Sequence, residues 1–309
     1  MSGTADQRLF LPFLDLTDMV MCRPAGTSLR VINQEAAQSG LRFPLVCEPQ
    51  ASLGAHMAAV DYASNSARFG PFVDNILGMN WELKSGKVVR IGERVIKSAT
   101  GYDLLRFLLH SDGRYGRATD YVLRLRPLGG ETAHVTFTGT DEVIEQICTT
   151  LRKSSWIHWI DAVDLCLTAQ GERSLHLDVD CALGEGVLFL DFFQEMGREG
   201  GADLTTISAP GFPGFPALSL KTTVPAATSL ARLLVREHGG SARVLCVNGV
   251  AFYYPPPDLR TLPDAFLADL ARQCAAEGGH LQGLWAPTAL PMEAEAAWAA
   301  QLENAWNQL

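Results

Sequence analysis

Two glycine-bounded segments in the first half of the chain constrain its fold most. Gly101-Tyr102-Asp103-Leu104 predicts the start of a short helix, and Ser111–Gly116 predicts a tight turn ahead of a strand at 121–127. Glycine lets backbone N–H groups approach a planar or anionic ligand closely, because no Cβ stands in the way. The same pattern also suits an ordinary turn, so the segments upstream must decide between a ligand site and a plain turn.

Four linked motifs share this half of the chain. They read SLGAHMA at 52–58, RFG at 68–70 followed by Asp74 and Leu77-Gly78, VIKSATGYDL at 95–104, and HSDGRYGRAT at 110–119. In order and spacing they resemble the second half of the FAD domain of FAD-linked oxidases of the vanillyl-alcohol oxidase type. Within that family, the FAD-binding subunit of bacterial glycolate oxidase is the most similar.

This resemblance implies FAD as cofactor, a small 2-hydroxy acid as substrate, and other oxidase subunits or a second copy of the chain as partners. The cofactor-binding positions that it implies are Ser52, Leu53, Gly54, Ala55, Arg68, Gly70, Asp74, Gly101, Tyr102, Asp103, Ser111, Gly113, Gly116, Arg117 and Ala118. It names no catalytic side chain, because hydride chemistry belongs to a bound flavin.

The family also has a smaller N-terminal subdomain, whose R-G-G-G-T/S loop surrounds the FAD pyrophosphate. The residues before Leu14 contain no such loop, and neither 184–186 nor 211–214 is predicted to open a helix as phosphate loops do. We therefore expect the chain alone to hold little FAD. Two classes of function stay open: an FAD-dependent oxidoreductase subunit completed by a partner chain, and a relative that has lost FAD and serves as a scaffold or assembly module.

Several residues depart from the family pattern around the expected adenine site. Arg117-Ala118 stands in place of two aliphatic residues, Arg114-Tyr115 adds bulk and charge, and His110 replaces a glycine. Burying an unpaired guanidinium is costly, so either Arg117 points to solvent or the pocket differs from that of the family.

The pattern predicts an α+β fold in two parts. Residues 1–127 form the truncated FAD-binding-type domain, including a helix capped by Thr27 or Ser28, and residues 128–309 form a cap domain, with the boundary at Pro127 and Gly129-Gly130. The cap is expected to contain strands at 175–180 and 187–193, and then a β-α-β-β-α-β ferredoxin-like unit. The elements predicted for this unit are a strand at 217–224, a helix at 229–237, strands at 243–247 and 250–254 joined by a type I′ turn at Asn248-Gly249, a helix from Pro263 and a strand at 280–285.

Lys221 is the candidate substrate-binding residue. It lies within an apolar strand, at a place where the glycolate oxidase subunit family has a basic residue, and a buried lysine needs an anion such as a carboxylate. Alternation along the strand permits the other interpretation, in which Lys221 faces solvent.

Composition excludes several other classes. A net charge of −9 argues against a nucleic-acid partner, and no stretch is long and apolar enough to predict a membrane span. Seven cysteines without a C-x-x-C pair, and no apolar N-terminal leader, favour free thiols in the cytoplasm. Histidine spacing predicts no metal site, and no nucleophile or paired-carboxylate signature stands out.

The surface at residues 45–120 would be exposed without the first subdomain. Apolar runs there predict self-association or a stable partner through this face. The alternative is that the N-terminal segment, with Leu9, Phe10, Leu11 and Phe13, folds back over it.

Overall fold

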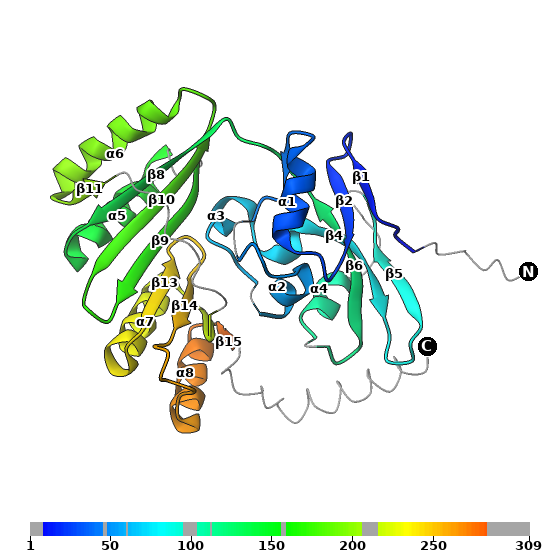
Figure 1. The fold of residues 1–309 in the computed structure, drawn as a ribbon. Helices are drawn as coiled ribbons and strands as arrows, with labels where there is room; N and C mark the ends of the chain where they lie inside the picture. Colours follow the sequence, from blue (N-terminus) through cyan, green and yellow to red (C-terminus); the bar gives the residue numbers. More distant parts are fainter. Residues whose placement is uncertain are drawn as a thin grey trace, which may run out of the picture.

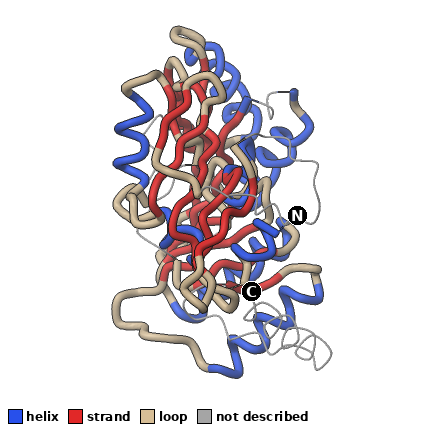
Figure 2. The backbone as a smooth tube through the Cα atoms, turned by 90° about the vertical axis from the view of Figure 1, so that its right-hand side faces the viewer, coloured by secondary structure: helices blue, strands red, loops and turns tan. Residues whose placement is uncertain are grey.

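The computed structural model describes residues 9–45, 48–59, 61–94, 104–111, 113–155, 159–205 and 216–282. The protein is α+β, as predicted, and is built on a five-stranded and an eight-stranded sheet, both antiparallel between neighbours (Figure 1). Turned by 90°, the strands run through the middle of the molecule with helices on both sides (Figure 2).

The five-stranded sheet carries the family-like motifs. Its order is β1 (Phe13–Asp15), β2 (Val20–Pro24), β6 (Arg117–Arg124), β4 (Ile76–Glu82) and β5 (Val88–Gly92). The helices beside it are α1 (Leu29–Ala37), α2 (Leu53–Ala59), α3 (Ser66–Phe69), the 3-10 helix η1 (Phe72–Asn75) and α4 (Leu104–Leu109), and a small ladder joins β3 (Leu41–Arg42) to β7 (Arg126–Pro127).

Helix α1 forms as the sequence predicts. The Ser28 hydroxyl accepts a hydrogen bond from the Val31 N–H, which satisfies one of the free donors of the first turn. Leu29, Ile32 and Ala36 are buried because their spacing places them on one side of the helix.

Phe10 supports the fold-back alternative for part of the first sheet. It is buried with Val20, Cys22 and Val122, and its backbone N–H and C=O both bond to the side chain of Asn80. Leu11 remains exposed. The described N-terminal residues therefore cover part of the predicted partner surface, at Asn80.

The eight-stranded sheet follows the first in sequence. Its order is β11 (Asp203–Thr205), β8 (Glu131–Thr138), β10 (Arg173–Cys181), β9 (Ile160–Thr168), β13 (Ser241–Leu245), β14 (Val250–Tyr254), β12 (Leu218–Lys221) and β15 (His280–Gln282). Its helices are α5 (Asp141–Lys153), α6 (Gly186–Gly200), α7 (Val224–His238) and α8 (Asp264–Ala276). All four lie on the side away from the first sheet (Figure 1).

This sheet contains the ferredoxin-like unit twice. The predicted unit is present as β12-α7-β13-β14-α8-β15, and β8-α5-β9-β10-α6-β11 repeats the same order of elements. The strand order of one half mirrors that of the other, and the halves meet where β9 pairs antiparallel with β13. A two-fold relation between the halves accounts for both features.

The unit β8-α5-β9-β10-α6-β11 was not predicted, because residues 187–193 were expected to form a strand and that prediction is wrong. These residues form the first part of α6, where Phe189, Phe193 and Met196 are buried and Val187 and Leu188 are exposed. A short continuous apolar run fits a buried strand or a helix equally well, and here the longer spacing of the three buried residues is helical.

The prediction that 184–186 opens no helix is wrong for the same reason. Gly186 is the first residue of α6, and its N–H donates to Glu131 Oε1 at 2.5 Å. A side-chain carboxylate therefore already occupies this helix N-terminus, which is where a phosphate would otherwise bind.

Two smaller expectations in the second unit also need correction. Helix α7 begins at Val224 rather than at 229, since Pro225 is well suited to a first helical turn. The β13–β14 hairpin forms as predicted, but its turn is not type I′, because Gly249 has φ +66° while Asn248 keeps a negative φ.

The helix-free face of the large sheet completes the first core. Leu245, Val250, Phe252 and Tyr254 from β13 and β14 are buried in the same cluster as Met21, Phe72 and Leu123 of the first part. The boundary at Pro127 stays a prediction, because this core is shared across it.

Among the described residues, no helix is long and apolar enough to cross a membrane. The six cysteines in that part of the chain are free thiols, five of them buried, and no group of metal-ligating side chains is found there.

His176 on β10 predicts an acid-sensitive contribution to stability. Its ring nitrogens lie 2.9 Å from Thr136 Oγ1 and 2.7 Å from Ser174 Oγ, and burial together with nearby Arg243 lowers its pKa to about 4. The unfolded chain takes up this proton near pH 6.5, so stability is lost as the pH falls from there toward 4. When the pH is lowered from about 7 to about 4.5, the free energy of unfolding of His176→Gln should fall by about 2 kcal/mol less than that of the original chain, as measured by urea unfolding. Equal losses would show that His176 does not titrate in this range.

Candidate functional site

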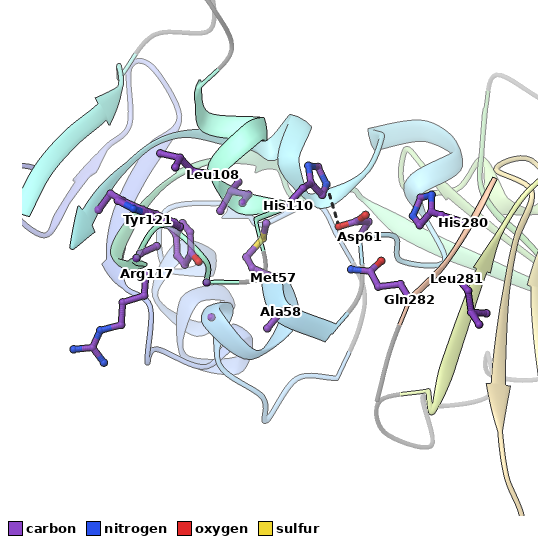
Figure 3. A pocket seen from close by; sticks show the side chains of 16 residues that line it. Met57, Ala58, Asp61, Leu108, His110, Arg117, Tyr121, His280, Leu281 and Gln282 are labelled. Atoms are coloured by element: carbon purple, nitrogen blue, oxygen red, sulfur yellow. Dashed lines mark ion pairs between the residues drawn. The ribbon is translucent and has the colours of Figure 1, made fainter. Parts of the chain in front are cut away.

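A cavity of about 840 Å³ lies between the first part of the chain and strand β15 (Figure 3). Its lining comes from α2 and the residue Asp61 after it, from β4, α4, the α4–β6 turn and β6, and from β15. The lining residues are Gly54, Met57, Ala58, Asp61, Trp81, Leu108, Leu109, His110, Gly113, Gly116, Arg117, Ala118, Tyr121, His280, Leu281 and Gln282. Its size is within the range of about 300–1,000 Å³ common for ligand pockets.

Five of the predicted cofactor-binding residues line this cavity. Gly54 comes from α2, Gly113 and Gly116 from the turn before β6, and Arg117 and Ala118 from the start of β6. The structure therefore brings together two segments, around Gly54 and at 113–118, that are far apart in sequence.

The glycines are required mainly by the packing of the cavity walls. At Gly116, with φ +133°, a Cβ would overlap the Glu82 carbonyl oxygen and the Trp81 indole nitrogen. At Gly54 a Cβ would lie 3.3 Å from the Ala25 carbonyl oxygen, with which the Gly54 N–H forms a 2.8 Å hydrogen bond. The motifs thus allow close approach of protein to protein, and the ligand space lies beside them.

Arg117 points to solvent, which is the first of the two possibilities that the sequence left open. Its Nε lies 2.6 Å from Glu82 Oε2, and the side chain is 78% exposed. Figure 3 shows its guanidinium directed away from the side chains at the other end of the cavity. No guanidinium is therefore buried against the expected adenine position.

The other described motif residues are not part of the cavity lining. Ser52, which precedes α2, accepts a hydrogen bond from the Ala55 N–H, Leu53 is fully buried, and Ser111 donates to the Leu108 carbonyl oxygen. Arg68 pairs with Asp161, Asp74 pairs with Arg106, and Gly70 has φ +75° beside Asp74. Gly101, Tyr102 and Asp103 lie outside the described residues, so their role stays a prediction.

Lys221 lies one strand away from the cavity. Its ammonium donates to the Asn248 carbonyl oxygen and lies 5.1 Å from the centre of the Tyr62 ring, and burial lowers its pKa. Lys221 forms no ion pair with the described carboxylates, so the expected carboxylate partner is not found among them. Its ammonium is also not simply in solvent, because a carbonyl oxygen and an aromatic ring lie beside it. Its neighbour across the ladder, His280, lines the cavity.

Asp61 and His110 form the most polar part of the cavity, and sequence analysis did not select them as a pair. His110 Nε2 lies 3.4 Å from Asp61 Oδ1, and His110 Nδ1 lies 2.9 Å from the Arg106 carbonyl oxygen (Figure 3). Both ring nitrogens thus face acceptors, which the doubly protonated imidazolium satisfies. The hydrogen bond to Asp61 accordingly raises the pKa of His110.

Strand β15 adds His280 and Gln282 from the opposite wall. The sequence signal for Asp61 and His110 was weak, because 49 positions separate two common residue types. The substitution of a family glycine by His110 was the one visible pointer, and it needed the fold to acquire a partner.

The lining suits the planar part of a dinucleotide cofactor better than its phosphates. Met57, Trp81, Leu108, Leu109 and Tyr121 supply apolar and aromatic surface, whereas the one arginine in the described lining is turned outward. A pyrophosphate needs several N–H donors or cations, and these side chains do not provide such a set. The cavity therefore fits a flavin or adenine ring system held beside His110.

Comparisons with known proteins agree with the family-like motifs. No protein-family profile matches the chain. A mitochondrial D-lactate dehydrogenase [cytochrome] of Arabidopsis thaliana is 35% identical over 115 residues, which are 37% of this chain and 20% of that protein. An uncharacterized FAD-linked oxidoreductase of Mycobacterium tuberculosis is 26% identical over 137 residues, 43% of this chain and 30% of that protein. Over these segments the chain is similar to FAD-linked oxidoreductases and D-lactate dehydrogenases.

Fold comparison extends the likeness to nearly the whole chain. A solved structure of alkyldihydroxyacetonephosphate synthase superposes with a TM-score of 0.66 at 12% identity, covering 98% of this chain and 65% of the other. At this identity the likeness concerns the fold alone. The aligned part of the chain spans only about a fifth to a third of the length of the curated relatives described above.

Two glycine substitutions should distinguish a glycine required by close packing against β4 from one required only by its positive φ. Gly116→Ala should destabilise the protein by more than about 2 kcal/mol, because its Cβ would overlap backbone of β4. Gly113→Ala should cost only about 1 kcal/mol, since Gly113 has φ +72° but its Cβ would meet nothing closer than 3.7 Å. Urea unfolding of both variants gives the comparison, and equal costs would contradict the packing role of Gly116.

The His110–Asp61 pair should stabilise the fold in a pH-dependent way. Because the folded-state pKa of His110 is raised, its stabilisation is fully present below the unfolded value near 6.5 and is lost as the pH rises through the folded value. His110→Gln should therefore lower the urea midpoint more at about pH 5.5 than at about pH 8.5. A difference that is the same at both pH values would show that the pair is not charged.

Proposed function

We propose that this chain binds the ring system of FAD in the cavity beside α2 and takes part in oxidation of a small 2-hydroxy acid. The observation that carries the proposal is the meeting of Gly54, Gly113, Gly116 and Ala118 with the Asp61–His110 pair and His280 around one cavity. The matched relatives support it, since they include D-lactate dehydrogenases and a D-2-hydroxyglutarate dehydrogenase of Xanthomonas citri, 24% identical over 38% of this chain.

Apolar side chains from α2, β4, α4 and β6 would hold the ring system. Met57 and Ala58 lie on one side of the cavity and Trp81 and Tyr121 come from the sheet, so that water is displaced from both faces of a planar group. The outward position of Arg117 leaves this space free of a buried guanidinium.

Oxidation of a 2-hydroxy acid needs a cation for the carboxylate and an acceptor for the hydroxyl proton. Bound FAD would supply the hydride acceptor. His110 lines the cavity, and its hydrogen bond with Asp61 raises its pKa, so that its protonated form would supply the positive charge beside the substrate carboxylate. His280 on β15 presents an imidazole on the opposite wall, where a ring nitrogen can accept the proton.

The finer assignments are also part of this proposal. The likeness to the FAD-binding subunit of glycolate oxidase favours partner subunits or self-association, with the pyrophosphate loop supplied by another chain or segment. A cytoplasmic location remains a prediction. The competing function, a scaffold that has lost FAD, is favoured by the lack of inward-facing phosphate donors in the described lining.

Titration with FAD tests the proposal and its competitor together. We expect quenching of flavin fluorescence to saturate with weak affinity, and Ala58→Leu to weaken binding at least about tenfold by filling the cavity. Ala275→Leu, an exposed alanine of α8, is the matched control and should bind as the original chain does.

Saturable binding that Ala58→Leu abolishes would support the flavin site. No saturation by FAD, or equal binding by both variants, would refute it and leave the scaffold function. Reduction of bound flavin by D-lactate, lost in His280→Gln with binding retained, would support the assigned proton acceptor.

A further inference from the structure

A second cavity, of about 450 Å³, lies where the chain passes from the first sheet to the second. Its walls are the α3 helix, β7, the Leu128–Gly130 connection and the β10–α6 turn, together with Trp159. It shares no lining residue with the cavity beside α2. It is therefore a separate site, and nothing in the proposed flavin chemistry uses it.

Three guanidinium groups surround one phenyl ring in this cavity. The Cζ atoms of Arg42, Arg68 and Arg126 lie 5.7, 5.3 and 6.0 Å from the centre of the Phe69 ring. Cations at these distances are attracted by the ring face, but they also repel one another. Such a cluster needs nearby anions.

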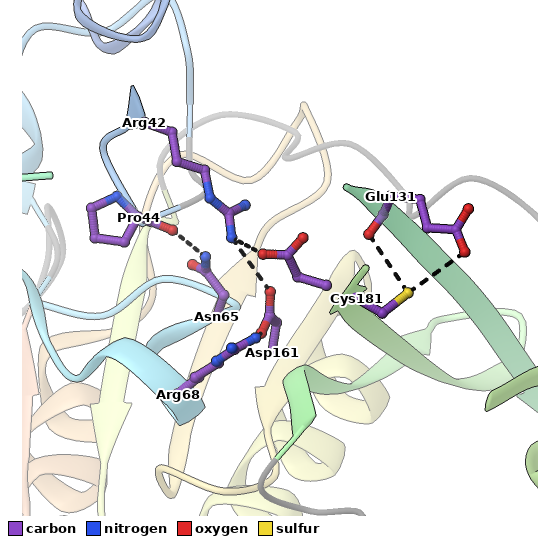
Figure 4. Close-up of polar contacts among 8 residues, drawn as sticks. Arg42, Pro44, Asn65, Arg68, Glu131, Asp161 and Cys181 are labelled. Carbon is purple, nitrogen blue, oxygen red and sulfur yellow. Dashed lines mark hydrogen bonds and ion pairs between the residues drawn. The ribbon is translucent and has the colours of Figure 1, made fainter. Parts of the chain in front are cut away.

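Two of the three arginines have carboxylate partners. Arg68 lies 2.6 Å from Asp161 Oδ1, and Arg42 pairs with Asp180 and lies 3.9 Å from Asp161 Oδ2 (Figure 4). Both carboxylates come from the large sheet and are mostly buried. These pairs join the two sheets and leave one positive charge of the cluster without a partner.

That charge is on Arg126 of β7. None of the described carboxylates pairs with it, and its buried Nε lacks a hydrogen-bond partner. Burial and the like charges of Arg124 and Arg68 lower its pKa. A planar donor group held without an acceptor, at the wall of a cavity, is suited to bind an anion from solution.

We propose that this second cavity binds a small organic oxyanion, with its carboxylate or phosphate head on Arg126 and an apolar or aromatic body against Trp159 and Leu128. Trp159 is 53% exposed and Leu128 47% exposed, and both line the cavity. Large apolar side chains at the mouth of a cationic cavity favour a ligand with both parts over a free inorganic ion. Glu185, also in the lining, disfavours ligands with several negative charges.

Binding of simple anions to the full chain tests this site. Titrations at constant ionic strength use benzoate, phenyl phosphate, acetate and inorganic phosphate, followed by calorimetry and by the change in tryptophan fluorescence. Benzoate or phenyl phosphate should saturate the site, and acetate and inorganic phosphate should bind at least about tenfold more weakly because they lack the apolar body. The benzoate and phenyl phosphate arms distinguish a carboxylate from a phosphate head group.

Variants of the cation provide the control. Arg126→Gln should weaken binding at least about tenfold, and Arg126→Lys should retain part of it, since charge is kept while the planar fork is lost. Arg272→Gln on α8, a 73% exposed arginine, changes net charge equally and should bind as the original chain does. Trp159→Phe should remove the fluorescence response while the calorimetric signal remains.

Thermal unfolding separates a ligand site from a structural arginine. Without ligand, Arg126→Gln should melt at the same or a higher temperature than the original chain, because an uncompensated cation is removed. Saturating benzoate should raise the melting temperature of the original chain and of Arg272→Gln, but not that of Arg126→Gln. The proposal is overturned if none of the four anions saturates, if Arg126→Gln binds unchanged, or if Arg126→Gln melts lower and shows no loss of binding beyond that of Arg272→Gln.

Discussion

Burial of the helix-free face of the large sheet against the first core is the interaction on which both candidate sites depend. Val250, Phe252 and Tyr254 alternate along β14 toward this interface, and each is at least nine-tenths buried. A fully buried side chain of this kind contributes about 1.5–3 kcal/mol, so the three dominate over any single polar contact nearby. The same packing brings β15 to the cavity beside α2, and it brings β9 against α3.

Polar pairs then determine how the two sheets are aligned. Arg243 and Asp164 are both buried at the seam between the ferredoxin-like units, 3.9 Å apart, and burial raises the pKa of Asp164 to about 6. The Arg68–Asp161 pair crosses between α3 and β9. Buried ion pairs of this kind add little net stability but disfavour alternative alignments, in which a charge would be left unpaired. The two cavities thus lie at an interface whose alignment is favoured by buried charge pairs.

Local sequence was informative wherever a short-range rule applied. Ser28 was predicted as a possible cap of α1 because capping depends on neighbours within one turn, and the β13–β14 hairpin follows from the Asn248-Gly249 signal. The family-like motifs likewise predicted which segments would gather, and Gly54, Gly113 and Gly116 do meet around one cavity. The strand predicted at 187–193 is wrong, because the apolar residues of this run have no spacing that distinguishes a strand from a helix.

The sequence by itself determined the α+β class, the family likeness, the second ferredoxin-like unit and the five motif residues that line the cavity beside α2. Only the tertiary structure decided what each of these residues does there. Arg117 turns outward because Glu82 on the neighbouring strand pairs with it, and Gly116 is needed because a strand backbone lies against it. His110 finds its partner, Asp61, in a distant segment, and the buried Nε of Arg126 has no partner in the described chain. No local sequence pattern encodes either outcome. Charge compensation is a property of three-dimensional proximity, which is why both sites were recognisable only once the chain was folded.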